Sequence, residues 1–442
     1  MSSTNLSRRT VAFQTMGCRL NQAETNLITK SLQARGYEIV TSEEDDAEVY
    51  ILNTCTVTQH SDAKNRQMIR SVHRNHPDAL IAVIGCYAQM SAQEIAEIEG
   101  VKLVLGNENK LQIADFLDEA RVSETPLVIT PKIVKTAFTL PVMDWLNPHQ
   151  TREHLKIQDG CDFMCSFCII PFARGRSRSR EFDNCLEEAR ALVQAGAKEL
   201  VLTGVNVGTY GIHSKTLIHM LDALNQLDGL ERIRISSIEP TTVEPLILQY
   251  MADPGHKLVP YLHLPLQSGS NEILEWMKRR YTREMFREDV LRAVEQVPDL
   301  CVGTDVMVGF PGETDEHFDQ TWQLLDSLPV HYFHVFPYSE REGTPAVRMA
   351  GKVTPQEKQR RSEVLRKLSQ WKRREFYGKA LKQIRYVLFE APKGSRIDGL
   401  TDNYIRVSVE GEAVGQYHNQ VLPVFLSELR EDMISGEIRT GD

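Results

Sequence analysis

The 442-residue sequence predicts an α/β protein of three parts: a doubly wound parallel-sheet domain, a partial (β/α)6 barrel and a small antiparallel β-barrel. Three observations predict this order. Buried apolar runs alternate with amphipathic helical stretches in the first quarter of the chain, and six strand-then-helix units follow them. Short alternating strands separated by turn residues occupy the last part. We expect the three domains to span residues 10–121, 147–378 and 379–440.

The first part predicts a parallel sheet with helices on both faces. Its strand candidates are almost wholly apolar, and helical periodicity separates most of them over residues 21–35, 61–74 and 91–98. Strands buried on both faces are typical of doubly wound sheets. The strand candidates are VAFQT, YEIV, VYILNT, LIAVIG and KLVLG. A proline-containing stretch over 122–150 has no clear period and is expected to be a linker or an irregular connection.

The second part repeats a strand and a helix, with helical patterns most evident over 181–195, 273–278 and 315–328. Six such units predict a partial barrel whose functional residues follow the carboxyl ends of the strands. Its strands are LKIQD, ELVLTG, RIRISS, YLHLPLQ, CVGTDVMVGF and HYFHVFPYS.

A long helix over 355–377 closes the second part. Thr354, Pro355 and Glu357 form a capping sequence at its start, and Gly378 is the expected stop. The strands IRYVLFE, YIRVSVE and QVLPVFL then predict the small barrel.

Composition limits the function classes. The net charge of −9 argues against a uniformly basic nucleic-acid binder but leaves room for a local basic surface. No apolar run reaches membrane-spanning length, and the start MSSTNLSRRT lacks the apolar core of a signal peptide. We therefore expect a cytoplasmic protein without a membrane partner. In that compartment, eight cysteines indicate metal or redox chemistry rather than structural disulfides.

Three cysteines form a tight C-x-x-x-C-x-x-C loop, CDFMCSFC, directly after the first strand of the second part. Three thiolates can hold three irons of a [4Fe–4S] cube and leave the fourth iron open to a substrate. A structural zinc site is the alternative, but zinc sites usually contain cysteine pairs and a fourth ligand. The three residues are Cys161, Cys165 and Cys168.

A second set of cysteines follows three strands of the first part: Cys18 after VAFQT, Cys55 after VYILNT and Cys86 after LIAVIG. Residues just past the carboxyl ends of parallel strands gather at one edge of a sheet. The three thiols are therefore expected to converge and to hold a second cluster, although three unrelated buried thiols remain the alternative. Cys185 and Cys301 are expected to be small core residues.

The cluster loop resembles that of the radical S-adenosylmethionine (SAM) superfamily, with Phe167 at the aromatic position that packs near the SAM adenine. The resemblance implies a [4Fe–4S] cluster whose open iron binds SAM, and further SAM contacts at later strand ends. Asn206 departs from the glutamate often found in its motif. Turn chemistry or ordinary buried polar groups are the alternative for these residues. The implied contacts are Gly204, Asn206, Ser237, Glu239, Gln267 and Gly309.

Both cysteine triads together resemble the methylthiotransferase family of radical SAM enzymes, over nearly the whole chain. The resemblance implies two [4Fe–4S] clusters, SAM, and a C-terminal TRAM domain that binds RNA. The stretch Gly17–Glu24, GCRLNQAE, resembles the MtaB type, which adds a methylthio group at C2 of N6-threonylcarbamoyladenosine beside the tRNA anticodon. The MiaB type, which acts on isopentenyladenosine, more often shows GCQMN. The sequence is also compatible with a ribosomal-protein methylthiotransferase, or with a non-catalytic iron–sulfur or zinc protein that binds RNA.

A basic helix supports a tRNA partner, engaged through its anticodon stem-loop. Residues 355–379 hold nine Lys or Arg against three Glu, and Arg174, Arg176, Arg178 and Arg180 form an alternating basic strip past the cluster loop. Such patches suit phosphate neutralisation, although a solvated helix face is the alternative. The family resemblance further implies an electron donor, such as a flavodoxin or ferredoxin, and a sulfur source. The nine residues are Lys358, Arg360, Arg361, Arg366, Lys367, Lys372, Arg373, Arg374 and Lys379.

Overall fold

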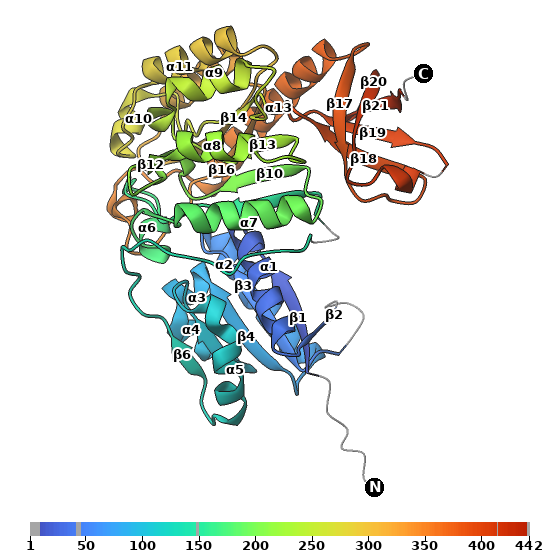
Figure 1. The fold of residues 1–442 in the computed structure, drawn as a ribbon. Helices are drawn as coiled ribbons and strands as arrows, with labels where there is room; N and C mark the ends of the chain where they lie inside the picture. The colour runs from blue at the N-terminus through green and yellow to red at the C-terminus, as the bar shows by residue number, and fades with distance from the viewer. Residues whose placement is uncertain (1–8, 41–45, 147–149, 413, 440–442) are drawn as a thin grey trace.

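The computed structural model describes residues 9–40, 46–146, 150–412 and 414–439. The first eight residues, where no signal peptide is expected, lie outside this range, as do the ends of two expected domains, 147–149 and 440. Figure 1 shows three units: the N-terminal domain in blue, the barrel above it mainly in green to yellow, and the small barrel in red to the side of the barrel. The predicted fold class is confirmed. No helix in the described part of the chain is both long enough and apolar enough to cross a membrane.

The N-terminal domain is a six-stranded parallel sheet in the order β2-β1-β3-β4-β5-β6. Separate apolar cores cover its two faces, as a doubly wound sheet requires. The strands are β1 (Thr10–Thr15), β2 (Glu38–Val40), β3 (Val49–Thr54), β4 (Leu80–Gly85), β5 (Val101–Leu105) and β6 (Leu127–Ile129). The helices are α1 (Arg19–Ala34), α2 (Gln59–Asn75), α3 (Cys86–Met90), α4 (Ala92–Ala96) and α5 (Ile113–Val122).

Strand β6 lies in the stretch expected to be irregular. It pairs with β5 at the edge of the sheet over three residues, which is too short a run to show a period of two. The rest of that stretch forms no further helix among the described residues, so the connection itself is as expected.

The barrel consists of two three-stranded parallel sheets, ordered β7-β10-β13 and β14-β15-β16, that follow one another in chain order. A bridge between Ile233 and Leu258 lies beside β13, where the two sheets meet. One large apolar core fills the space between strands and helices. The strands are β7 (Arg152–Lys156), β10 (Glu199–Thr203), β13 (Arg232–Ile235), β14 (Tyr261–His263), β15 (Cys301–Val308) and β16 (Tyr332–Pro337). The helices are α7 (Phe182–Gln194), α8 (Leu217–Asn225), α9 (Pro245–Ala252), α10 (Asn271–Trp276), α11 (Arg283–Gln296) and α12 (Asp315–Ser327).

The long helix α13 (Pro355–Lys379) joins the barrel to the small barrel. The Thr354 hydroxyl accepts a hydrogen bond from the Glu357 N–H at 3.3 Å, which confirms the predicted cap. Gly378 does not stop the helix, which ends one residue later.

The small barrel closes in the order β17-β18-β19-β21-β20. Four of its pairs are antiparallel, but β19 and β21 run parallel, so the antiparallel prediction holds for all but the closing pair. The sequence pattern missed β18 and β21, whose residues alternate weakly. The strands are β17 (Ile384–Phe389), β18 (Arg396–Thr401), β19 (Arg406–Glu410), β20 (Val421–Arg430) and β21 (Met433–Ile438).

A buried cluster of charges joins the N-terminal domain to the barrel. Glu24 of α1 pairs with Lys110 of its own domain, with Lys156 at 2.7 Å and with Arg174 at 3.0 Å. Asp159 completes the cluster through Lys156 and Arg174. Because each charge has partners of opposite sign, the cluster fixes the position of one domain on the other.

This cluster corrects the prediction of a basic strip for tRNA. Arg174 and Arg180 are buried, and Arg180 pairs with Glu188 beneath the surface. Arg178 pairs with Glu108 at 3.0 Å, and only Arg176 is exposed, where it binds Asp162. The alternating spacing arises because these arginines bind carboxylates of the protein itself.

Candidate active site

The first cysteine triad lies at the carboxyl edge of the N-terminal sheet. Strands β3 and β4 end directly before Cys55 and Cys86, and β1 ends at Thr15, three residues before Cys18. A Cβ on Gly17 would lie 2.6 Å from the Cys55 Cβ, so the chain before Cys18 passes too close to Cys55 for any side chain. Gly85, before Cys86, adopts a φ of +99°, which other residues rarely accept. The edge is therefore shaped to bring the three thiols near one another.

Polar groups surround this triad. The Asn107 side-chain N–H donates to the Cys86 sulfur at 3.5 Å, and the Arg174 guanidinium lies near this sulfur. Burial, and then the neighbouring Cys86 and Cys18, raise the pKa of the Cys55 thiol to about 12. As a free thiol Cys55 is therefore protonated, and a metal that bound it would release its proton.

The second triad lies on the loop after β7 and the short strand β8 (Gln158–Asp159). The Cys161 N–H donates to the Gly175 carbonyl at 3.1 Å, and the Cys168 N–H donates to the Cys165 carbonyl at the same distance. Arg279 donates to the Cys165 sulfur at 3.1 Å. Burial raises the pKa of Cys168 to about 12. The loop thus presents three sulfurs beside a fixed cation.

Neither triad is arranged around a single ion. Among the described residues, no three His, Cys, Asp or Glu side chains stand close enough to share one metal. A zinc ion needs its ligands around one centre, whereas the thiolates of a [4Fe–4S] cube bind different irons at separate corners.

Gln158 joins the cluster loop to the turn after β10, a role that the sequence did not indicate. Its side-chain oxygen accepts hydrogen bonds from the N–H groups of Val205 at 2.8 Å and Asn206 at 3.0 Å. Its amide donates to the carbonyl of Gly160, beside Cys161. A Cβ on Gly204 would lie 2.8 Å from the Gln158 oxygen, so only glycine fits this turn.

Asn206 and Glu239, two of the expected SAM contacts, lie next to each other. The Asn206 side-chain oxygen lies 3.4 Å from the Glu239 N–H and 3.3 Å from the Thr242 hydroxyl, which donate to it. The Asn206 amide nitrogen is buried and has no partner in the described residues. Glu239 forms an ion pair with Arg279, the same arginine that contacts Cys165.

The other expected SAM residues are spread more widely. Phe167 packs against the small apolar cluster that includes Phe310 and Tyr338. Gln267 has a φ of +68°, and its backbone bridges to β15. Gly309 has a φ of +72° and packs against Lys358. Of the expected contacts, only Gly204 and Ser237 line the cavity described next.

A cavity of about 450 Å³ lies where the three units meet. The N-terminal domain contributes Cys18 and Arg19, the barrel contributes the ends of its strands, and the small barrel contributes Tyr404. The Nε2 atom of His263 lies 3.1 Å from a carboxylate oxygen of Asp305 in its wall. The site thus combines a thiol of the first triad with the carboxyl ends of the barrel strands. The barrel lining includes Thr203, Gly204, Ser237, His263, Asp305 and His334.

Sequence reasoning missed Arg19, Tyr404 and the two histidines of this cavity. His263 was detectable, because it is a polar residue at the carboxyl end of an otherwise apolar strand, and His334 is a polar residue within another apolar strand. Tyr404 lies 385 residues from Arg19, to which its hydroxyl is hydrogen-bonded, and no local pattern links them.

Two family models match the chain: "Uncharacterized protein family UPF0004" over residues 10–106 and "Radical SAM superfamily" over residues 155–325. The chain is similar to "Threonylcarbamoyladenosine tRNA methylthiotransferase MtaB" of Aquifex aeolicus, with 40% identity over 91% of this chain and 97% of the relative. The protein of the same name in Bacillus subtilis is 39% identical over 91% of this chain and 90% of the relative. The chain belongs to the radical SAM methylthiotransferase family.

The chain is also similar to a second type of tRNA-modifying enzyme and to a solved radical SAM structure. This methylthiotransferase family member is 33% identical to "tRNA-2-methylthio-N(6)-dimethylallyladenosine synthase" of Staphylococcus haemolyticus over 81% of this chain and 71% of the relative. It shares its fold with the radical SAM methyltransferase TsrM of Kitasatospora setae, with a TM-score of 0.57, 16% identity and coverage of 77% of each chain.

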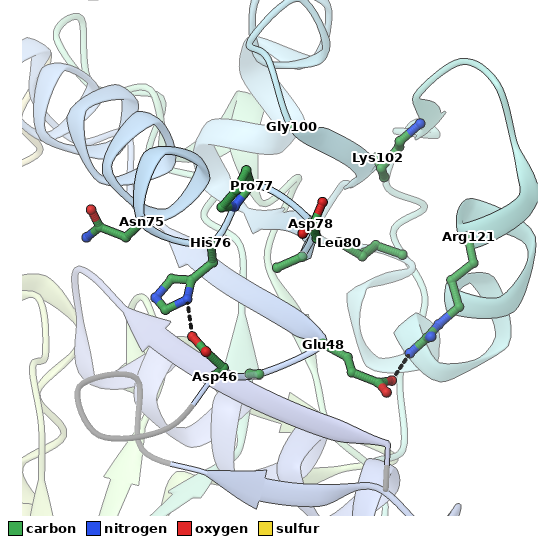
Figure 2. A pocket seen from close by; sticks show the side chains of 12 residues that line it. Asp46, Glu48, Asn75, His76, Pro77, Asp78, Leu80, Gly100, Lys102 and Arg121 are labelled. Atoms are coloured by element: carbon green, nitrogen blue, oxygen red, sulfur yellow. Dashed lines mark hydrogen bonds and ion pairs between the residues drawn. The ribbon is translucent and has the colours of Figure 1, made fainter. Parts of the chain in front are cut away.

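A second cavity of the family member, of about 630 Å³, lies away from the cysteines (Figure 2). It opens beside the starts of β3 and β4, at the opposite edge of the sheet from the triad. Its charges pair with one another: His76 with Asp46 at 2.7 Å, and Arg121 with Glu48 at 3.0 Å. It is not part of the methylthiotransferase site.

Cys185 and Cys301 are confirmed as buried core residues. The basic helix α13 is only partly available to a partner. Arg361 is buried against Glu313, and Lys372 donates to the backbone carbonyls of Asp326 and Leu328. The other engaged cations are Lys358, Arg360, Arg374 and Lys379. Arg366 and Lys367 are exposed, and half-buried Arg373 lies over the Tyr332 ring.

Proposed function

We propose that this family member is a tRNA methylthiotransferase that converts N6-threonylcarbamoyladenosine beside the anticodon to its 2-methylthio derivative. The observation that carries the proposal is the 40% identity to the Aquifex aeolicus protein of that name, over nearly the full length of both chains. The stretch GCRLNQAE around Cys18 supports the same subtype. The proposed cofactors are two [4Fe–4S] clusters and SAM.

The donor set fits two clusters. We assign one cluster, which would bind SAM, to Cys161, Cys165 and Cys168. We assign the other cluster, which would carry the sulfur to be transferred, to Cys18, Cys55 and Cys86. Sulfur atoms of both triads already accept hydrogen bonds, from Arg279 and from Asn107, which is the environment that a thiolate ligand needs. When bound, the clusters and SAM supply the radical and the sulfur chemistry, and the chain supplies position and exclusion of water.

The residues around the cluster loop suit SAM. Gln158 holds the Gly204–Asn206 turn against the loop, and the turn leaves a buried Asn206 amide without a partner among the described residues. A buried donor without a partner is costly, so it suits an acceptor atom of a ligand. Glu239 is the nearby acceptor, held by Arg279. We assign the roles of SAM contacts to Gly204, Asn206, Ser237 and Glu239, and weaker roles to Phe167, Gln267 and Gly309.

Charges near the cavity suit tRNA phosphates. A neighbouring cavity of about 250 Å³, between the barrel and the small barrel, is lined by Arg373 and Arg406. It shares Tyr332, His334 and Tyr404 with the larger cavity. A nucleotide that entered the larger cavity would leave its flanking phosphates near these arginines. We therefore propose that the small barrel acts as a TRAM-type RNA-binding domain beside α13.

The remaining partners follow from the proposed reaction. An electron donor, such as a flavodoxin or ferredoxin, and a sulfur source are required for turnover. With tRNA as the proposed substrate, we propose that the protein works in the cytoplasm.

Nucleoside mass spectrometry of tRNA from a deletion strain tests the proposal. We expect the 2-methylthio derivative of N6-threonylcarbamoyladenosine to disappear and to return with the restored gene. Loss of the methylthio derivative of isopentenyladenosine instead would assign the alternative subtype, and unchanged tRNA would favour a ribosomal-protein substrate.

A further inference from the structure

Arg19 is the unusual cation of the central cavity. Its guanidinium is half-buried next to Cys18, and it donates to the Tyr404 hydroxyl at 3.0 Å. Tyr261, Tyr332 and Tyr404 line the same cavity, and a second cation, Arg234, lies over the rings of Tyr261 and Tyr404. Among the described residues, no carboxylate lies within 4 Å of it.

The buried arginines nearby are different, because each has a carboxylate of the protein. Arg174 pairs with Glu24, Arg234 with Glu199 and Arg279 with Glu239. A partly desolvated cation without an anion is unfavourable unless a ligand supplies one. Asp305 is in the same cavity but is paired with His263. The cavity therefore suits a ligand with a negative charge at the Arg19 wall.

The proposed substrate has a negatively charged group that suits the Arg19 wall of the cavity. The threonylcarbamoyl group ends in a carboxylate, whereas a dimethylallyl group has no charge. In adenine, C2 and C6 flank N1, so a substituent on N6 lies close to the carbon that accepts the methylthio group. Because Arg19 follows Cys18, it lies beside the triad to which we assign the transferred sulfur.

We propose that Arg19, held in place by Tyr404, binds the carboxylate of the threonylcarbamoyl group and thereby selects this nucleoside. The inference rests on the proposed function and adds the residue that distinguishes this substrate from an uncharged one. Guanidinium and carboxylate can form two parallel hydrogen bonds, which gives direction as well as affinity. Phosphates have other partners, because Arg373 and Arg406 line the neighbouring cavity toward the small barrel.

Binding of three anticodon stem-loop RNAs to the reconstituted protein tests the inference. The RNAs contain N6-threonylcarbamoyladenosine, its methyl ester or unmodified adenosine, at one salt concentration. We expect the wild-type protein to bind the carboxylate form roughly ten- to a hundredfold more tightly than the ester. In Arg19→Gln, the ratio of the affinity for the carboxylate RNA to the affinity for the ester RNA should fall close to one, and the affinity for unmodified RNA should be almost unchanged. In Arg19→Lys, this affinity ratio should stay above one but below the wild-type value.

Two further variants show whether a change in RNA affinity arises from a loss of folding rather than from the loss of a specific contact. Tyr404→Phe removes only the hydroxyl that holds Arg19 and should lower the ratio by a smaller factor. Arg373→Gln removes a charge from the neighbouring cavity and should weaken all three RNAs alike. An unchanged ratio in Arg19→Gln would overturn the inference, and so would equal weakening of all three RNAs, which would assign Arg19 to phosphate binding.

Product analysis separates this inference from the proposed function. If the wild-type protein does not add a methylthio group to the threonylcarbamoyl RNA, the proposed function is wrong. If it does, and Arg19→Gln still prefers the carboxylate to the ester, only the role of Arg19 is wrong.

Discussion

Hydrogen bonds from nitrogen donors distinguish two of the cysteines with a proposed role from the cysteines in the core. Cys165 and Cys86 accept hydrogen bonds from Arg279 and Asn107. Cys185 and Cys301 are buried among apolar side chains. N–H donors favour the thiolate that binds iron, and an apolar environment favours the neutral thiol.

Iron content tests this distinction at single residues. Cys55→Ala should lower the iron of the reconstituted protein from about eight to about four per chain, because one [4Fe–4S] cube is lost. Cys185→Ala is the matched control and should keep about eight. The measurement is an iron and sulfide assay after anaerobic reconstitution. Equal iron in both variants would contradict the assignment of Cys55.

Among the elements, α13 shows how a basic sequence can serve packing. Arg361 and Lys372 point into the protein, where they bind Glu313 and the carbonyls after α12. The charges left for a partner are concentrated in the second half of the helix, at Arg366, Lys367 and Arg373. Arg374 donates a hydrogen bond to the backbone carbonyl of Glu431.

The salt dependence of tRNA binding tests whether the second half of α13 contacts tRNA phosphates. Replacing Arg373 and Arg374 by Ala should weaken binding and lower the slope of log affinity against log salt by about 0.7–0.9 for each lost phosphate contact. Arg360→Ala is the control, because Glu357 already neutralises this exposed arginine. If the double substitution does not change the slope, the basic residues of α13 face solvent and do not contact tRNA phosphates.

For the whole molecule, the charge cluster around Glu24 decides how the N-terminal domain sits on the barrel. Burial by itself would raise the pKa of Glu24, but Arg174, Lys110 and Lys156 hold it well below its usual value. A carboxylate with a lowered pKa stabilises the fold above its ordinary pKa and loses this effect as the pH falls through the folded value. The junction between the domains is therefore sensitive to acid.

Glu24→Gln tests the cluster. The substitution leaves three buried cations with one fewer negative charge and should cost about 3–5 kcal/mol of unfolding free energy at neutral pH. The midpoint of urea unfolding measures it. As the pH falls from neutral to about pH 4 and below, the unfolding free energy of the wild-type protein should decrease more steeply than that of the variant. Equal midpoints at neutral pH would show that the cluster does not stabilise the junction.

The sequence was sufficient to predict what depends on local pattern. The apolar strands, the capped helix α13 and the positions of Cys18, Cys55 and Cys86 after strands are all visible in it. Contacts between distant segments were not predictable, because no period or motif links Arg19 to Tyr404 or Gln158 to the turn at Val205. The basic strip was misread for a related reason: the buried carboxylate partner of Arg174 is 150 residues away.

The central claim for the whole molecule is that the two triads do separate work. Cys161 lies on a barrel loop, and Cys18 lies at the edge of another domain's sheet, so each site should assemble without the other. Cys161→Ala should abolish reductive cleavage of SAM.

The most direct test is product analysis of Cys18→Ala after anaerobic reconstitution, with SAM, a reductant and tRNA. This variant should still form 5′-deoxyadenosine but should make no methylthio-tRNA, and it should retain about four irons per chain. Methylthio-tRNA from Cys18→Ala, or a single cluster in the wild-type protein, would contradict the central claim.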